Sequence, residues 1–372
     1  MKILVTGSKG FIGKNLCLWL ENAGHDVLGF DIDESIETLK SYVESADFIV
    51  HLAGVNRPLN EEEFIDGNVN FTKQLLDIVR DKKSSASIIF SSSVKAEEDS
   101  PYGRSKLQAE KLVEEFGKKN GNNVFIYRLN NVFGKWCRPN YNSVIATFCH
   151  NVAHGMELQI NENALPIEFI YIDDICRQFL KTIKENPVEH ASILYIEPKY
   201  RRSLKDIAYS LYSFKESRKN FMVPNIVDDF DKKLYSTYLS YLDEDDFSYP
   251  LTTHSDYRGS FTEILKTNGA GQFSVNISKP GIVKGNHYHN TKNEKYLVVA
   301  GTCEIKFRKI GTSKIFTYVC SDKELKVVDI PPGYTHSIKN IGKTDSVTFM
   351  WANELYDPDN SDTFYLPVEE TK

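Results

Sequence analysis

Over residues 1–200, short apolar runs alternate with longer amphipathic segments, and this alternation limits the possible folds more than any other feature. The apolar runs have the length of buried strands, and the segments between them have helical spacing. Strands that alternate with helices form a parallel sheet, because each crossover helix covers one face of it. The runs are "KILVTG", "HDVLGFD", "DFIVHLAG", "SIIFSSS" and "NVFIYRLNNVFG". The sequence therefore predicts an α/β domain with a doubly wound parallel sheet.

The character of the chain changes after the acidic stretch "LDEDDFSYP", which ends at Pro250. Beyond residue 252, short β-rich runs follow one another with Gly, Pro, Asn and Asp between them, and helical periodicity is absent. This pattern is typical of an antiparallel sandwich or barrel. We therefore expect one domain over residues 1–245, a linker over 243–251 and an all-β domain over 252–372.

Composition excludes several classes of function. The net charge of −6 disfavours binding to nucleic acid or to an anionic membrane surface. The six cysteines include no C-x-x-C pair, so we expect reduced thiols. The sequence has no apolar run near the ~20 residues that span a bilayer, and a strand from residue 2 leaves no room for a signal peptide. We expect a cytoplasmic protein that does not insert into membranes.

The stretch "TGSKGFIG" places Gly7, Gly10 and Gly13 between the first strand and the first helix. Glycines at such a turn let a pyrophosphate approach the backbone N–H groups of a helix N-terminus. Asp31 closes the second strand, where a carboxylate can hydrogen-bond the adenosine ribose. The stretch therefore predicts a dinucleotide site, although the spacing is G-x-x-G-x-x-G instead of G-x-G-x-x-G.

Tyr102 and Lys106 stand four residues apart in "SPYGRSKLQAE", at the expected start of a helix. Residues at this spacing share one helix face, and a neighbouring cation is expected to lower the pKa of the phenol. A tyrosine tuned in this way can exchange a proton near neutral pH. The preceding strand ends in Ser92 and Ser93, either of which could hydrogen-bond a substrate carbonyl oxygen.

In order and spacing, "TGSKGFIG", "HLAGVNRP", "FSSSV", "YGRSK", "RLNNVFG" and "FIYIDD" resemble the extended short-chain dehydrogenases/reductases that act on nucleotide sugars. The resemblance implies a Rossmann-type fold with Tyr102 as catalytic acid, Lys106 as its tuner and Ser93 as carbonyl partner, Ser92 being the alternative. It places the nucleotide diphosphate near Asn131 and Arg138. The residues that it implies for the coenzyme are Gly7, Gly10, Phe11, Ile12, Gly13, Asp31, Leu52, Ala53, Tyr102 and Lys106.

A second cluster lies in "GIVKGNHYHNTKNEKYLVVAG", with His287, His289 and Glu294, and "PPGYTHSIKN" adds His336. Alternate residues of a strand point the same way, so two of the imidazoles can face one site. Three imidazoles and one carboxylate suit zinc or another divalent metal and leave a position open for a ligand. A polar pocket without metal is the alternative.

These two segments resemble the paired motifs of cupin barrels, although Leu325 replaces the leading glycine of the second motif. "SDYRGSFTEILK" and "GIVKGNHYH" further resemble the RmlC-like branch, which epimerises 4-keto-6-deoxy nucleotide sugars. That resemblance implies Arg258 and Lys284 as ligands of the nucleotide end. It also leaves two roles for His287, metal ligand or base that removes a carbon-bound proton.

The two halves together resemble the bifunctional capsular-polysaccharide enzymes of the CapF type. The resemblance implies a homodimer with zinc that acts on a UDP-2-acetamido-2,6-dideoxy-4-hexulose. It implies C3 epimerisation and then NADPH-dependent C4 reduction to the 2-acetamido-2,6-dideoxy-L-talose, on the route to UDP-N-acetyl-L-fucosamine. NADH is the alternative coenzyme, because the carboxylate of Asp31 would repel a 2′-phosphate unless Lys9 or Lys14 offset it.

The chemistry itself sets the order of the two steps. The C3 hydrogen is acidic only while C4 is a ketone, because the enolate spreads its charge onto that oxygen. Reduction removes this acidity, so epimerisation must come first. The rival interpretations are a reductase whose cupin only dimerises or binds sugar, a dehydratase or C4 epimerase that retains its NAD, and a cofactor-binding sensor without turnover.

Overall fold

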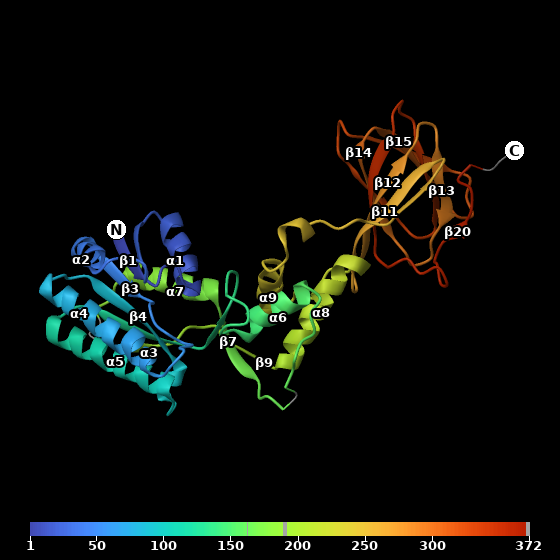
Figure 1. The fold of residues 1–372 in the computed structure, drawn as a ribbon. Coiled ribbons are helices and arrows are strands. Elements are labelled where there is room, and N and C mark those ends of the chain that lie inside the picture. The colour runs from blue at the N-terminus through green and yellow to red at the C-terminus, as the bar shows by residue number, and fades with distance from the viewer. Residues whose placement is uncertain (162, 189–191, 370–372) are drawn as a thin grey trace. The chain divides into compact units, whose positions relative to one another are not determined.

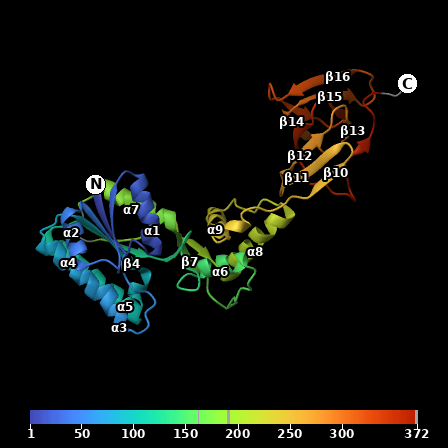
Figure 2. The ribbon, with the colours of Figure 1, turned by 45° about the horizontal axis from the view of Figure 1, so that its top comes forward.

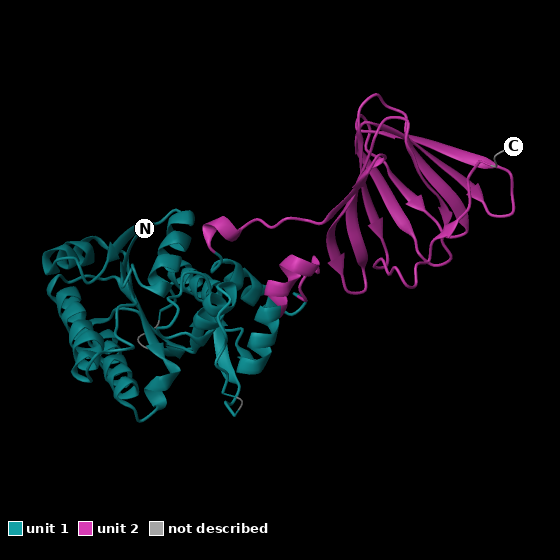
Figure 3. Ribbon diagram, turned by 45° about the vertical axis from the view of Figure 1, so that its right-hand side comes forward, with its two compact units in different colours: residues 1–212, 226–242 teal, residues 213–225, 243–372 magenta. Residues whose placement is uncertain are grey.

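The computed structural model describes residues 1–161, 163–188 and 192–369. They form two compact units (Figure 3). The first unit contains residues 1–212 and 226–242, and the second contains residues 213–225 and 243–372.

A six-stranded parallel sheet is the centre of the first unit (Figure 1). All its pairings are parallel. In spatial order the strands are β2 (Asp26–Phe30), β1 (Lys2–Thr6), β3 (Phe48–His51), β4 (Ser87–Ser93), β5 (Val124–Leu129) and β8 (Ser192–Leu194). The order reverses between β1 and β3, and in such sheets ligands bind beyond the carboxyl ends of the strands at this point. The predicted doubly wound parallel sheet is confirmed.

Helices cover both faces of this sheet (Figure 2). Side chains of β1 alternate between the faces, so Ile3 and Val5 pack with α1 and α7 while Leu4 packs with α2, α4 and α5.

The α-helices of the described residues, including those that do not cover this sheet, are α1 (Phe11–Asn22), α2 (Ile36–Ser45), α3 (Glu62–Phe64), α4 (Phe71–Asp81), α5 (Pro101–Asn120), α6 (Val144–Ala153), α7 (Ile172–Glu185), α8 (Leu204–Asn220) and α9 (Asp229–Leu239). Among the described helices, none has the length and apolarity that crossing a membrane requires.

A small sheet of β6 (Asn131–Phe133), β7 (Ile167–Tyr171) and β9 (Tyr200–Arg202) extends the first unit beyond β5. The run "NVFIYRLNNVFG" therefore forms two strands, β5 and β6, with Asn130 between them. This break carries the chain from the large sheet to the small one.

The second unit is built of antiparallel strands in two sheets, as expected for the all-β part. Both sheets contribute side chains to one core, which includes Tyr296, Ile305 and Ile338. One sheet has the order β10 (Thr253–Asp256), β11 (Gly259–Thr267), β12 (Gly271–Ser278), β19 (Ser346–Ala352), β14 (Glu294–Ala300) and β17 (Val327–Ile330). The other has the order β16 (Ile315–Ser321), β15 (Thr302–Lys309), β18 (Tyr334–Asn340), β13 (Val283–Tyr288) and β20 (Phe364–Tyr365).

Residues 213–225 belong to the second unit, which differs from the division expected at residues 243–251. The N–H of Val223 donates to the carbonyl of Lys266 at 2.7 Å, and the N–H of Lys266 donates to the carbonyl of Phe221 at 2.7 Å. These bonds attach the segment to β11. A long-range backbone pairing of this kind leaves no mark in the local sequence pattern.

Candidate active site and metal centre

The glycine loop follows β1 and packs against the end of β3. Gly7 has φ +72°, and a Cβ there would lie 2.8 Å from the backbone nitrogen of Ala53 and 3.1 Å from the carbonyl carbon of Leu52. A Cβ at Gly13 would lie 2.1 Å from the carbonyl oxygen of Gly7. Only glycine fits at such positions. The structure therefore brings together the loop and the two residues predicted to join it in the coenzyme site.

Helix α1 begins directly after Gly10, which caps it without a side chain, so Phe11 and Ile12 supply its first turn. The N–H groups of such a turn can bind a phosphate. The carboxylate of Asp31 reaches the same loop, where it accepts a hydrogen bond from the backbone N–H of Lys9 at 2.7 Å. The Lys9 ammonium itself pairs with Asp33 at 2.5 Å. The loop, the helix start and Asp31 fit the pyrophosphate and ribose of a dinucleotide.

Helix α5 presents Tyr102 and Lys106 as predicted. It is capped by Ser100, whose hydroxyl accepts from the N–H of Gly103 at 3.0 Å. The Lys106 ammonium donates to the carbonyl of Ser91 at 2.8 Å, and burial lowers its pKa to about 8. Tyr102 shares a hydrogen bond with Ser93. Tyrosine, lysine and serine therefore meet at the carboxyl end of β4.

The predicted direction of the pKa shift of Tyr102 was wrong. Burial raises the pKa of Tyr102 above its ordinary value, and the hydrogen bond with Ser93 opposes this only in part. The reason is that desolvation disfavours the phenolate, while the Lys106 ammonium is directed to the Ser91 carbonyl. In this state Tyr102 is a protonated phenol, which suits a proton donor.

The structure distinguishes the two serines. Ser92 is buried and donates to the carboxylate of Glu110, which also binds Arg128 through two bonds of 3.0 and 2.8 Å. Glu110 is 3% exposed and Arg128 is 7% exposed. Ser93 is the serine that reaches Tyr102, so it remains the proposed carbonyl partner. Sequence reasoning missed Glu110 and Arg128, although both lie in the quoted motifs "YGRSKLQAE" and "NVFIYRLNNVFG".

Substituting each serine by alanine separates their roles. We expect Ser93→Ala to lower kcat for ketone reduction by about 10²-fold, the scale seen when one oxyanion donor is removed. Ser92→Ala should leave kcat nearly unchanged and lower the free energy of unfolding by about 1–3 kcal/mol, because the buried Glu110 loses a donor. Steady-state kinetics and urea unfolding of both variants test this. A larger kcat loss in Ser92→Ala would reverse the assignment.

Two further polar residues lie behind the site, of which Asn68 was not predicted and His51 was expected to pack near the cofactor without a role in the chemistry. The amide of Asn68 pairs with the backbone of Val55 at 2.8 and 3.0 Å and donates to the hydroxyl of Ser105 at 3.0 Å. His51 lies between the hydroxyls of Thr6 and Thr72, and burial and then Lys106 lower its pKa to about 3. His51 is therefore a neutral packing residue, and Asn68 fastens the loop after β3 to α5.

The residues predicted to hold the nucleotide diphosphate lie on the surface of the first unit. Asn131 begins β6 and donates to the carbonyl of Glu168 at 3.2 Å. Arg138 follows in the next loop, with its guanidinium 5.4 Å from the ring centroid of Tyr141. Both side chains are exposed and accessible to a ligand, and their substrate role stays a prediction.

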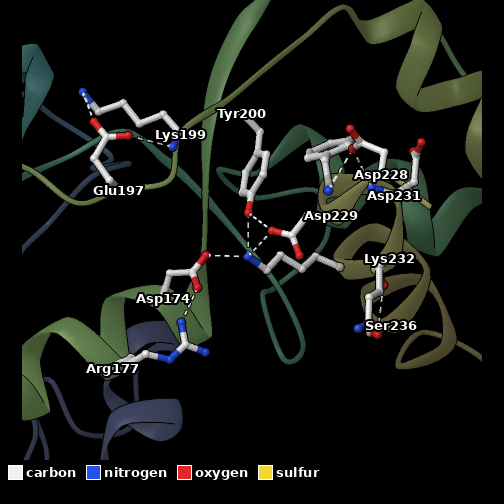
Figure 4. A network of polar contacts seen from close by, with 12 residues as sticks. Asp174, Arg177, Glu197, Lys199, Tyr200, Asp228, Asp229, Asp231, Lys232 and Ser236 are labelled. Atoms are coloured by element: carbon white, nitrogen blue, oxygen red, sulfur yellow. Dashed lines mark hydrogen bonds and ion pairs between the residues drawn. The ribbon is translucent and has the colours of Figure 1, made fainter. Parts of the chain in front are cut away.

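A partly buried ion-pair network joins α7, β9 and α9. Figure 4 shows Asp174, Tyr200 and Asp229 directed to one amine, which belongs to Lys233. The distances from this nitrogen are 2.9 Å to Asp174, 2.5 Å to Tyr200 and 2.8 Å to Asp229. Arg177 also binds Asp174, at 2.6 Å. The motif "FIYIDD", which supplies Asp174, therefore holds α9 to the small sheet.

Removing the central amine should destabilise the first unit. We expect Lys233→Met to lower the free energy of unfolding by about 2–3 kcal/mol, because Asp174 is 4% exposed and, within the described part of the chain, would keep only Arg177 as a charged partner. Lys232→Met, one residue earlier on the exposed side of α9, is the matched control. Urea denaturation should show equal stability for the control and wild type. Equal stability of both variants would contradict the role given to the network.

The second cluster comes together from both sheets of the second unit. His287 lies in β13 and pairs across the sheet with His336 of β18, while Glu294 comes from β14 of the other sheet. His289 directly follows β13. One ligand atom from each of the four residues lies within 4.8 Å of the others. The predicted cluster of three imidazoles and one carboxylate is therefore present.

The donor set fits a divalent metal. Among the described residues, Nε2 of His289 and Nδ1 of His336 are buried and find no hydrogen-bond partner. Nε2 of His289 and Nε2 of His336 each lie 3.4 Å from the carboxylate of Glu294. Burial and then His336 and His289 lower the pKa of His287 to about 4, so its imidazole is neutral and can bind a metal. Tyr296, which sequence reasoning missed, donates to Glu294 at 2.9 Å.

The two cations predicted for the nucleotide end lie near each other in the second unit. Arg258 forms an exposed pair with Asp256 at 2.7 Å. Lys284 is half-buried and donates to the side chain of Asn276 at 2.6 Å and to the carbonyl of Ile277 at 2.9 Å. Burial lowers the pKa of Lys284, and Asp256 and Arg258 act on it in opposite directions. Lys284 and His287 share β13, so a ligand on this strand could contact both.

Comparison with family models gives two matches. The model of the NAD dependent epimerase/dehydratase family matches residues 3–194. The model described as polysaccharide biosynthesis C-terminal domain matches residues 254–364. The two matches therefore fall on the parallel-sheet part and on the antiparallel part.

Known proteins match the whole chain. One named UDP-2-acetamido-2,6-beta-L-arabino-hexul-4-ose reductase, from Pseudomonas aeruginosa, is 44% identical over 371 residues and 100% of both chains. A crystal structure of the capsular polysaccharide assembling protein CapF from Staphylococcus aureus is 48% identical, with TM-score 0.93, covering 99% of this chain and 100% of that one. A Bacillus cereus UDP-glucuronic acid 4-epimerase in complex with NAD is 22% identical, with TM-score 0.53 over 65% of this chain and 98% of that one, which shows a shared fold alone.

Proposed function

The chain belongs to the NAD dependent epimerase/dehydratase family, and on this premise we propose that it is a bifunctional nucleotide-sugar enzyme. Its second unit epimerises C3 of a UDP-2-acetamido-2,6-dideoxy-4-hexulose, and its first unit reduces the C4 ketone with NADPH. The product is the UDP-2-acetamido-2,6-dideoxy-L-talose, on the route to UDP-N-acetyl-L-fucosamine for capsular polysaccharide. The observation that carries the proposal is the meeting of Tyr102 and Ser93 at the sheet edge that also bears the glycine loop.

In the reduction, Tyr102 donates its phenolic proton to the C4 oxygen, and the Ser93 hydroxyl hydrogen-bonds the same oxygen. Reduced nicotinamide, held at the glycine loop and Asp31, would supply the hydride to C4, so that one C–H and one O–H bond would form as the carbonyl π bond breaks. The ammonium of Lys106 stabilises the tyrosinate that remains. The name of the 44% identical relative, a reductase of a UDP-linked hexul-4-ose, supports this half of the proposal.

In the epimerisation, a base removes the C3 proton, and a proton returns to the opposite face. His289, Glu294 and His336 would hold a divalent metal, for which we propose zinc, and His287 is either a fourth ligand or the base. The metal would supply electrostatic stabilisation to the enolate oxygen. An imidazole nitrogen that binds the metal cannot also remove a proton, so the two roles exclude each other.

The proposal includes NADPH as coenzyme, with NADH as the alternative. The carboxylate of Asp31 is already hydrogen-bonded by the N–H groups of Lys9 and Ile32, which reduces its repulsion of a 2′-phosphate. Lys9 is exposed beside it and can pair with that phosphate. We expect a higher kcat/KM with NADPH than with NADH when both are measured side by side. The reverse order would contradict the coenzyme assignment.

The second candidate function is a reductase whose cupin only binds sugar or dimerises. The outermost strand β16 favours a homodimer in either case, because Phe316, Tyr318 and Val319 are 38%, 53% and 59% exposed. An exposed apolar edge strand readily pairs with another strand. Light scattering of the full chain would give a mass near 42.5 kDa if the protein were a monomer, contrary to the proposed homodimer.

The experiment that tests the proposal is addition of the UDP-linked 4-hexulose to the purified full-length protein with reduced coenzyme. We expect stoichiometric loss of absorbance from NADPH and formation of a deoxy-sugar with a C4 hydroxyl. Failure of the hexulose to oxidise either NADPH or NADH would remove the proposed function.

A further inference from the structure

The carboxylate of Asp362 binds the turn 290–292, which lies between His289 and Glu294 of the metal cluster. Asp362 precedes β20 and lies about seventy residues from the turn 290–292 in sequence. Its carboxylate accepts the backbone N–H groups of Asn290 at 3.0 Å, Thr291 at 2.7 Å and Lys292 at 2.8 Å. It also accepts the hydroxyl of Thr291 at 3.1 Å. Consecutive N–H groups around one carboxylate form a strong anion-binding turn, and here the anion belongs to the protein.

The main chain of the same residue orients His289. Nδ1 of His289 lies 2.5 Å from the carbonyl oxygen of Asp362. Because a carbonyl can only accept, Nδ1 carries the hydrogen, and the lone pair of Nε2 is directed to the cluster, 3.4 Å from Glu294. His289 is 1% exposed, so there is little space for another rotamer. The other tautomer would lose the hydrogen bond to the Asp362 carbonyl.

We infer that Asp362 is a positioning residue for the metal centre. Its carbonyl fixes which nitrogen of His289 is available to the metal, and its carboxylate fixes the turn that sets the separation of His289 and Glu294. The inference rests on the proposed metal site. It assigns the C-terminal segment before β20 a role in metal affinity, although that segment supplies no ligand.

The expected effect is a loss of metal affinity without a change of ligands. Groups that hydrogen-bond metal ligands change affinity by about 10–100-fold when they are altered. Asp362→Ala releases all four donors of the turn, and Asp362→Asn places an amide NH₂ among N–H groups. We expect Asp362→Ala to lower metal affinity by up to about 100-fold and Asp362→Asn to lower it less. Asp359→Asn, an exposed carboxylate of the same segment, is the control and should bind metal as wild type does.

The test is chelator competition with Zn²⁺ on metal-free, full-length protein, together with the visible spectrum of the Co²⁺-loaded protein. The d–d bands of cobalt report ligand geometry, so they should shift in both Asp362 variants and stay unchanged in the Asp359 control. Equal zinc affinity and equal spectra of wild type and both Asp362 variants would overturn the inference and leave the metal centre standing. Failure of the wild-type protein to bind Zn²⁺ or Co²⁺ would instead remove the metal centre and the inference with it. If Asp362→Ala does not fold, as circular dichroism would show, Asp362→Asn decides.

Discussion

Tyr102→Phe is expected to lower the rate of ketone reduction by about 10²–10⁴-fold, the range that general acid catalysis contributes. The variant keeps the ring that packs against Phe64 but loses the proton that must reach the C4 oxygen. Because Tyr102 lies in the first unit, solvent exchange at C3, which we assign to the second unit, should continue. The measurement is coenzyme oxidation in parallel with deuterium incorporation into recovered 4-hexulose.

Tyr209→Phe is the matched control, since this tyrosine is 79% exposed on α8. Its reduction rate should equal that of wild type. A Tyr102→Phe protein that still reduces the ketone within tenfold of wild type would show that another group supplies the proton. Loss of C3 exchange in the same variant would instead show that the two activities do not reside in separate sites.

Glu294→Gln is expected to reduce C3 exchange by at least about 10²-fold, while direct reduction of a 4-hexulose that already has the product configuration at C3 continues. The carboxylate is the single anionic member of the cluster, and Tyr296 donates to it. An amide binds a divalent metal less strongly than a carboxylate does, so stabilisation of the enolate oxygen is lost. Deuterium exchange and zinc content of the same preparation are measured together.

Glu324→Gln provides the control, because Glu324 is an exposed glutamate paired with Lys326 at 2.8 Å. It should exchange C3 at the wild-type rate. Normal exchange in Glu294→Gln with zinc absent would make the metal structural and favour the cupin as a binding or dimerisation module. Normal exchange with zinc retained would show that the carboxylate is dispensable.

Local pattern was enough to predict the large sheet and the residues that lie together in the two candidate sites. The alternation of strands and helices and the glycine loop are encoded in short contiguous stretches, and so are the Tyr102–Lys106 spacing and the histidine motifs. The structure brings the predicted members of each site together, as Gly7 beside Ala53 and His287 opposite His336 illustrate.

What could not be predicted depends on contacts between distant segments. Glu110 and Arg128 meet across α5 and β5, and Asp362 reaches His289 over a separation of 73 residues. The attachment of residues 213–225 to β11 is also a long-range pairing. The pKa of Tyr102 was predicted in the wrong direction because burial, which a sequence does not display, outweighs the hydrogen bond with Ser93.

The central claim is that one C4 ketone serves both units, first to acidify C3 and then to accept hydride. The most direct test is proton NMR of the product formed from the UDP-linked 4-hexulose and NADPH by the full-length protein in deuterated water. The account predicts a 6-deoxy-talose product with deuterium at C3 and protium at C4, where the hydride arrives. A reduced product that carries protium at C3 would contradict it.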